Sequence, residues 1–295
     1  MATAQATFAR PAPRTALGRA VRFVTRGPVQ IALLVVGLLW LLPTFGLLVS
    51  SFRPAAESGA SGWWTVFTNP SQLTVETYAR ILDRPDMITA LLNTVLITVP
   101  TAILLVAVAS LAAYAFAWVR FPGRDALFLL VVGLLVVPLQ MALIPVSGLY
   151  AQVGLFGQIP GVVLFHLAFG MPFAVFLLRN FFIGIPHELL EAARMDGASE
   201  WRVFSRVVLP LAIPAIASLL IFQFLWVWND LLVALVFAGQ DARPMTVLIQ
   251  QQMRQFGANF DIIAPAAFLQ MIVPLIVFFA FQRYFVQGIL AGSVK

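Results

Sequence analysis

Apolar runs that approach the length of a membrane crossing recur along the whole chain, and this feature restricts the possible folds most strongly. A helix needs about 20 consecutive, mostly apolar residues to cross the hydrocarbon core of a bilayer. Only 10% of the 295 residues are charged, whereas a soluble domain has about 25%. The sequence therefore predicts an all-α integral membrane protein with six transmembrane helices. The six runs cover about 29–49, 88–119, 126–146, 161–178, 211–238 and 263–281. Pro138 and Pro145 are expected to kink the third run.

The segments outside these runs predict tails and loops rather than a folded soluble domain. Residues 1–28 carry five arginines and no acidic residue, and we expect them to form a cytoplasmic tail. The first apolar run is longer than the core of a signal peptide, which favours a retained span. The transmembrane region would cover 29–284 and a second tail 285–295. The loop at 51–87 is too weakly patterned to predict a folded module.

The distribution of basic residues predicts the orientation in the membrane. Thirteen of the 18 basic residues lie near the two ends of the chain, in the turn at 120–124 and in the segment 179–206. These places share one side of a six-span arrangement, and basic residues accumulate in cytoplasmic loops. Both termini are therefore expected in the cytoplasm, with the chain in a bacterial-type cytoplasmic membrane. This placement explains the net charge of +6 without a nucleic-acid partner.

The longest polar passage in the second half of the chain lies between the fourth and fifth runs. Its sequence, ELLEAARMDGASEWR over 188–202, predicts two short amphipathic helices around a turn. Gly197 can adopt the left-handed conformation that ends a helix. Leu189, Leu190 and Ala193 are expected to share one helix face. Trp201, Phe204 and Val208 are expected to form an apolar stripe on the next helix. Periodicity alone fits a linker on the membrane surface as well as a docking element.

The residues of this passage and their spacing resemble the EAA loop of ABC-transporter permeases. The pattern is Glu-Ala-Ala at 191–193, three residues, Gly197, nine residues, and then Val207-x-Leu209-Pro210. The resemblance implies that the loop at about 180–210 is a coupling helix that docks into a cleft of a separate ATPase subunit. The residues that it assigns to ATPase coupling are Glu191, Ala192, Ala193, Met195, Asp196, Gly197, Trp201, Leu209 and Pro210.

About two-thirds of the chain is similar to the smaller permease subunit of maltose-type sugar importers. The similar passages lie at 93–124, 168–210, 228–230 and 281–295. The resemblance implies a homologous second permease, two ATPase subunits that bind ATP and Mg²⁺, and an extracytoplasmic sugar-binding protein. It implies that the C-terminal tail contacts the ATPases through Ala291, Gly292, Ser293, Val294 and Lys295. It also implies that a loop near 250–261 probes the binding protein through Gln252, Arg254, Gln255, Phe256 and Gly257.

The sequence predicts no catalytic residue, bound cofactor or metal ligand in this chain. A phosphate-binding P-loop requires a lysine after its glycines, and the only lysine is the last residue, Lys295. ATP hydrolysis would therefore belong to another polypeptide. The two histidines, His166 and His187, do not have the spacing of a helical zinc site, and no G-x-S-x-G motif is present.

Asp230 is the one acidic residue that we place well inside an apolar run. Carboxylates within membranes are costly and indicate functional sites. One interpretation is a translocation path for sugar lined by Gln223, Trp228, Asn229 and Asp230. A helix–helix hydrogen bond, or a position near the external interface, is an equally good interpretation of Asp230. The functional alternatives are an ABC permease for another small solute, or a secondary transporter, for which Asp230 is the only candidate coupling charge.

Overall fold

The computed structural model describes the backbone of residues 16–253 and 260–293 and the side chains of 27–253 and 261–282. Helices and turns make up this described part, which contains no β-strand. The prediction of an all-α protein is confirmed.

The longer helices form in the apolar runs, and short helices occupy the segments between them. The α-helices are α1 (Ala16–Ser51), α2 (Ala55–Ala60), α3 (Glu76–Leu82), α4 (Pro85–Trp118), α5 (Arg124–Gly133), α6 (Leu139–Gln152), α7 (Ile159–Ile183), α8 (His187–Met195), α9 (Glu200–Val203), α10 (Leu209–Leu211), α11 (Ile213–Trp228), α12 (Leu232–Phe237), α13 (Met245–Met253) and α14 (Phe260–Ser293). The other helical turns are η1 (Trp63–Phe67), η2 (Pro70–Gln72), η3 (Leu134–Val136), the π-helical η4 (Phe204–Val208) and η5 (Gln240–Ala242).

Four described helices are long and apolar enough to cross a membrane. They are α1 over Gly27–Ser51, α4, α7, and α14 over Asp261–Gln282. Two bent pairs also qualify when each is taken together: 124–136 with α6, bent by 101°, and 200–211 with α11, bent by 75°. The described residues therefore contain four crossings, or up to six if each bent pair crosses once.

The third apolar run is not the single kinked helix that the sequence predicts. It ends as η3, and α6 then leaves at 101° to the preceding helix. Pro138 explains the break, because proline forces the residue before it out of the helical region. Val137 is accordingly extended, with ψ at 117°. Pro145, the other expected kink, lies inside α6 without ending it.

The fifth run is also divided, and its division changes the position of Asp230. Helix α11 stops at Trp228, and α12 begins at Leu232. The Asp230 carboxylate accepts hydrogen bonds from the backbone N–H groups of Val233, at 3.4 Å, and Ala234, at 3.0 Å. Asp230 therefore caps the start of α12 in a helix break, and the expectation of a position well inside a continuous span is wrong.

The sequence predicts no folded module between the first two runs, and this prediction is also wrong. Residues 52–76 wrap around Arg53, whose side chain is buried. Its guanidinium donates to the Gln72 side chain at 2.9 Å and to the Ser61 hydroxyl at 2.7 Å. The Glu57 carbonyl accepts a further bond at 2.8 Å. A buried charge must be hydrogen-bonded, so Arg53 ties α2, η1 and η2 together.

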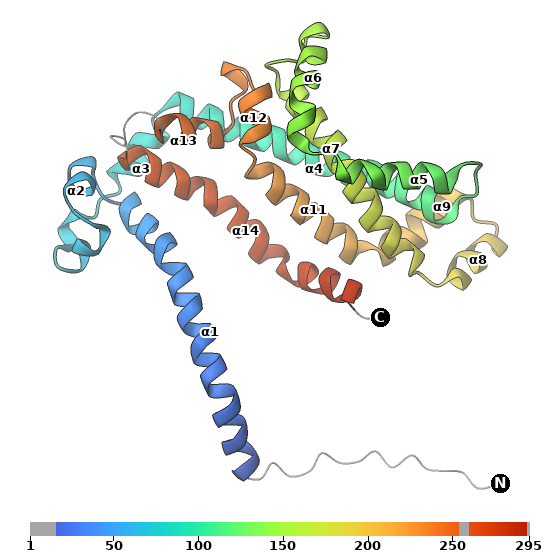
Figure 1. Ribbon diagram of the computed structural model, residues 1–295, viewed down its shortest axis with the longest axis horizontal. Coiled ribbons are helices and arrows are strands. Elements are labelled where there is room, and N and C mark those ends of the chain that lie inside the picture. The colour runs from blue at the N-terminus through green and yellow to red at the C-terminus, as the bar shows by residue number, and fades with distance from the viewer. Residues whose placement is uncertain (1–15, 254–259, 294–295) are drawn as a thin grey trace.

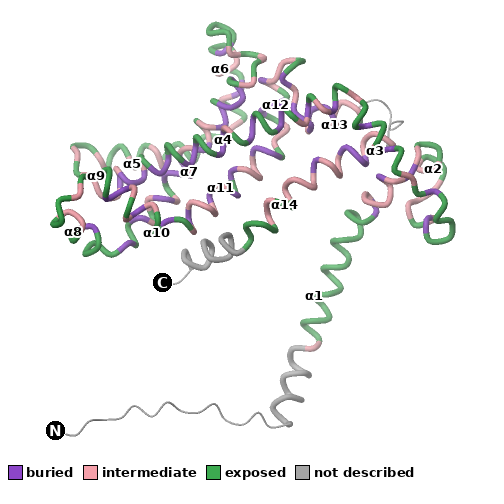
Figure 2. Tube along the Cα trace, turned by 180° about the vertical axis from the view of Figure 1, so that it is seen from behind, coloured by how far each residue is buried: buried purple, intermediate pink, exposed green. Residues whose placement is uncertain are grey.

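The core lies where α4 packs against α7 and α11, whereas α1 leans away from this bundle (Figure 1). Figure 2 shows exposed residues along most of the described length of α1, intermediate and buried ones in its last turns, and buried ones along α4, α7 and α11. Only 6% of the most apolar window of α1 is buried within the chain. The helix starts at Ala16, already inside the segment predicted as a tail. Helix α14 likewise continues unbroken through 285–293.

Candidate functional site

Helix α8 presents one buried and one exposed face at the end of the bundle. Leu190 is completely buried in the cluster that α4, α7 and α11 form, and Ala193 packs against the same cluster. Leu189 is 45% exposed, so it does not share their face as expected. The reason is the helical period, since adjacent residues point about 100° apart. The outward side carries Glu191, Ala192, Met195, Asp196 and Gly197.

Gly197 ends α8 as the sequence predicts. Its φ angle is +77°, in the left-handed region. Its N–H donates to the Arg194 carbonyl, and the N–H of Ala198 donates to the Ala193 carbonyl, both at 3.0 Å. These two bonds form a Schellman motif, which satisfies the last carbonyls of a helix. The turn thereby reverses the chain and brings α9 alongside α8.

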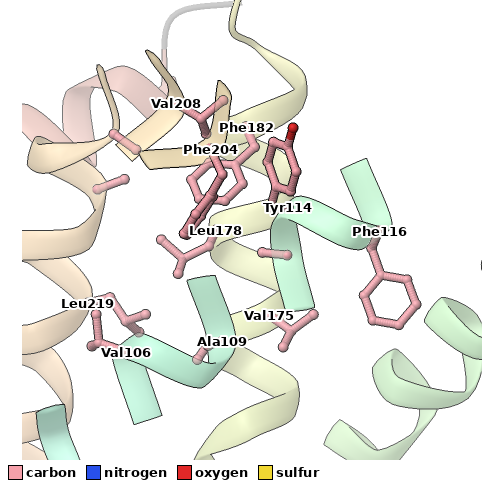
Figure 3. Packing of buried hydrophobic residues seen from close by; sticks show 14 of the residues in the cluster. Val106, Ala109, Tyr114, Phe116, Val175, Leu178, Phe182, Phe204, Val208 and Leu219 are labelled. Carbon is pink, nitrogen blue, oxygen red and sulfur yellow. The ribbon is translucent and has the colours of Figure 1, made fainter. Parts of the chain in front are cut away.

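The second arm of the loop is attached to the membrane helices by apolar side chains. Val203, Phe204 and Val208 are buried, and Figure 3 shows Phe204 and Val208 among side chains from α4 and α7. Leu209 packs against the same cluster, whereas Pro210 is exposed. Trp201 is 66% exposed, although the sequence pattern placed it in one stripe with Phe204. The loop is therefore fixed on its inner side and open on its outer side.

A carboxylate joins both arms of this loop to α4. Glu200 accepts bonds from the Arg194 guanidinium, at 2.8 Å and 3.2 Å, and from the Tyr114 hydroxyl, at 2.5 Å. The bond from Arg194, together with that from Tyr114, lowers the pKa of the Glu200 carboxyl, and the bond to Glu200 raises the pKa of Arg194. On the outer face, the His187 imidazole lies 2.9 Å from the Glu191 carboxylate, one turn away.

Gln223 lies beside a groove lined by aromatic residues. The groove has a volume of about 310 Å³. The Gln223 side chain is buried against Gly170, and its amide nitrogen has no hydrogen-bond partner among the residues with described side chains. The other residues that line the groove are Val137, Leu139, Phe169, Phe173, Phe222 and Trp226.

The other three residues predicted for the translocation path make contacts within the chain. Trp228 is buried, and its indole N–H donates to the Gln270 carbonyl at 2.9 Å. The Asn229 amide donates to the Leu225 carbonyl at 2.8 Å, and its side chain is exposed. Asp230 caps α12 and lies 3.5 Å from the His166 imidazole. None of the three lines the groove beside Gln223.

The remaining predicted contact residues are placed only in part. Gln252 lies at the end of α13 and is half-buried. Arg254, Gln255, Phe256 and Gly257 lie outside the described residues. Ala291, Gly292 and Ser293 form the end of α14, whereas Val294 and Lys295 lie outside the described residues.

Comparison with known proteins assigns this architecture to a family. Residues 79–291 match the family described as the inner-membrane component of binding-protein-dependent transport systems. The chain belongs to that family. As an inner-membrane component of this kind, it is a multi-pass transport subunit, and ATP hydrolysis belongs to a separate subunit.

Two curated relatives of this transport component match most of its length. The osmoprotective compounds uptake permease protein GgtD of Synechocystis sp. is 49% identical over 282 residues, which cover 94% of this chain and 95% of the relative. The alpha-glucoside transport system permease protein AglG of Rhizobium meliloti is 46% identical over 255 residues, 84% of this chain and 67% of the relative. A solved bacterial ABC transporter involved in alginate import has the same fold, with a TM-score of 0.76 at 22% identity, and the match covers 94% of this chain and 100% of that one.

Sequence reasoning missed two groups in this transport component. The contact of Tyr114 with Glu200 joins residues 86 positions apart, and no local pattern indicates it. The aromatic groove combines residues of α6, α7 and α11 that each suggest only packing or lipid contact. A polar residue between apolar neighbours, Gln223, was the one signal that pointed to the groove.

Proposed function

We propose that this chain is the permease subunit of an ATP-driven importer and moves a sugar or oligosaccharide by alternating access. The observation that carries the proposal is the two-sided structure of α8. Its inner side, through Leu190, is part of the packed core of α4, α7 and α11, and its outer side is free to bind a partner. A partner that shifts α8 must therefore also shift these helices, because a close-packed core transmits displacement.

The partner that fits the outer side of α8 is a nucleotide-binding ATPase, of which two copies would supply ATP and Mg²⁺ chemistry. The EAA pattern supports this assignment, and Glu191, Ala192, Met195, Asp196 and Gly197 would form its contact surface. We further propose that a homologous second permease completes the membrane unit and that the tail at 291–295 reaches the ATPases. An extracytoplasmic binding protein would deliver the sugar to the side that holds the 250–261 loop.

In this arrangement both termini lie in the cytoplasm, and the bent segments that contain α6 and α11 each cross the membrane once. The placement of basic residues supports this orientation. The six-span region would then extend over 29–284, between cytoplasmic ends at 1–28 and 285–295.

The translocation path in this proposal follows the groove beside Gln223. Ligand sites combine aromatic walls with a few polar groups that fix orientation. The Gln223 amide nitrogen, which has no hydrogen-bond partner among the described side chains, provides such a group. Trp226, Phe169 and Phe222 would contact the apolar faces of sugar rings. Trp228, Asn229 and Asp230 would support the path from the α11–α12 break rather than line it.

The substrate class rests on the relatives. AglG is an alpha-glucoside permease by its name, and this supports a glycoside as cargo. GgtD is named for osmoprotective compounds, and it is more identical to this chain than AglG is. A small solute other than a glycoside is therefore the second candidate for the cargo.

The test is purification of the chain from its native membrane in mild detergent, followed by mass spectrometry and an ATPase assay. We expect a second permease and a nucleotide-binding subunit, with ATP hydrolysis stimulated by a binding protein loaded with the cargo. A panel of glycosides and non-sugar osmolytes on that binding protein separates the two substrate classes. Recovery of the chain alone, with solute flux in liposomes that lack ATP, would contradict the proposal and favour a secondary transporter.

A further inference from the structure

The carboxylate of Glu200 connects three elements that are separate in sequence. It starts α9, it bonds to Arg194 of α8 through both oxygens, and it accepts the hydroxyl bond of Tyr114 from the last turns of α4. We call Arg194, Glu200 and Tyr114 the elbow clamp. Its position matters if α8 binds an ATPase, so the inference below rests on the proposed function.

Stability is a poor explanation for the ion pair in the clamp. The Arg194 and Glu200 side chains are 31% and 53% exposed, and ion pairs at such exposed positions contribute little to stability. The apolar core already holds the second arm, because Val203, Phe204 and Val208 are buried.

The apolar contacts do not fully determine the orientation of α8. In α8 only Leu190 is fully buried, and Ala193 packs beside it against the same cluster. These two contacts on one face leave the rotation of the helix about its own axis loosely defined. A bidentate arginine–carboxylate pair supplies geometric specificity as well as energy. The pair spans the Gly197 turn, so it fixes the angle between α8 and α9.

Tyr114 connects this fixed angle to the membrane helix. Its ring is buried, with 6% of the residue exposed, and lies 5.2 Å from the Phe204 ring. The Tyr114 hydroxyl donates a hydrogen bond to the Glu200 carboxylate, which also accepts the hydrogen bonds of Arg194. A rotation of α8 thus acts on α4 through a short chain of two hydrogen-bonded contacts.

We propose that Arg194 and Tyr114 are positioning residues of the transport cycle. Through Glu200 they hold α8 in one orientation on α4, so that movement of the ATPase turns the membrane helices instead of only tilting α8. Without the clamp, ATP is hydrolysed but the displacement of α8 is partly lost before it reaches α4.

The experiment uses the complete complex in liposomes, with binding protein and radiolabelled sugar, and measures ATP hydrolysis and sugar uptake in the same vesicles. For Arg194→Gln, Glu200→Gln and Tyr114→Phe we expect sugar moved per ATP to fall at least about 5-fold, the lower end of typical coupling between sites. The double variant Arg194→Gln with Glu200→Gln should be no worse than either single variant, because the two residues act as one unit. Arg194→Lys keeps the charge but not the fork-shaped geometry, so it should restore the ratio only in part.

Two matched variants control for general damage. Arg120→Gln removes an exposed arginine from the neighbouring α4–α5 turn. Tyr150→Phe removes the hydroxyl of another largely buried tyrosine, at the far end of α6. Both variants should move as much sugar per ATP as the wild type.

Three results would overturn the inference while leaving the proposed function intact. They are an unchanged ratio in Arg194→Gln and Glu200→Gln, an equal fall in the two control variants, and loss of the ATPase from the purified complex, which would mean direct binding. Because Arg194 and Glu200 are partly exposed, their variants remain informative even if Tyr114→Phe fails to insert. Failure of the proposed function is recognised separately, since the wild-type complex would then show no sugar-dependent hydrolysis.

Discussion

Replacement of Gly197 by alanine tests whether the shape of the loop formed by α8 and α9 depends on its turn. A β-carbon at this position would meet no atom within 4 Å, so the substitution creates no clash. The whole cost arises from the φ angle of +77°, which disfavours an L-residue by about 1–2 kcal/mol. A cost of this size raises the population of the open turn by a factor of about 5–30.

Hydrogen exchange measures this population directly. The amides of Gly197 and Ala198 close the Schellman motif, and local opening governs their exchange. We expect both amides to exchange about 5–30 times faster in Gly197→Ala, with a corresponding loss of sugar uptake. Asparagine tolerates the left-handed region better than alanine, so Gly197→Asn should be milder. Gly197→Asp also adds negative charge at the C-terminal end of α8, where the helix dipole disfavours it, and should abolish uptake while the chain still inserts.

The control is Gly37→Ala in α1, where a β-carbon also meets no atom within 4 Å and the backbone is helical. This change should leave exchange in the loop and sugar uptake unaltered. Wild-type exchange at Gly197 and Ala198 in Gly197→Ala would refute the reasoning, as would an asparagine variant more disruptive than alanine.

Other positions give predictions with different readouts. Leu190→Ala should lower the free energy of unfolding by about 2–5 kcal/mol, measured by denaturation in detergent, because the site is fully buried. Gly170→Ala places a methyl group 2.4 Å from a leucine side chain of α4 and should cost about 1–3 kcal/mol in the same assay. Arg53→Met removes the five guanidinium hydrogen bonds that join Arg53 to Glu57, Ser61, Thr65 and Gln72, so limited proteolysis should cut residues 52–76 while the helical bundle stays resistant. Asp230→Asn should reduce uptake less than Gly197→Asp, and the reverse order would place Asp230 on the substrate path.

The parts of the structure that sequence could predict are those that local chemistry determines. The Gly197 turn follows from the conformational freedom of glycine at the end of an amphipathic segment, and α4 and α7 follow from apolar length. The EAA pattern predicts a docking role for this loop because the identities and spacing of its residues are specific. These features can be predicted without knowing which segments pack against them.

The parts that sequence could not predict depend on contacts between distant segments. Nothing in the sequence near Arg53 indicates that it is buried, because its neutral hydrogen-bond acceptors come together only when the loop folds around it. From sequence alone Asp230 is placed within a membrane span, because nothing local indicates that the helix ends at Trp228. Pro138 was recognised as a kink, yet the size of the bend depends on what α6 packs against after the chain has turned.

The exposure of most of the described length of α1 has a consequence for how such permeases can be rebuilt. Few of its residues are buried within the chain, and the family match begins at residue 79, after both α1 and the Arg53 module. The bundle of α4, α7 and α11 thus owes little of its packing to the first helix. A chimaera that carries a foreign membrane helix of the same direction before Arg53 should keep this bundle, and α1 becomes the natural place to attach a reporter or a crosslinker without redesigning the transport machinery.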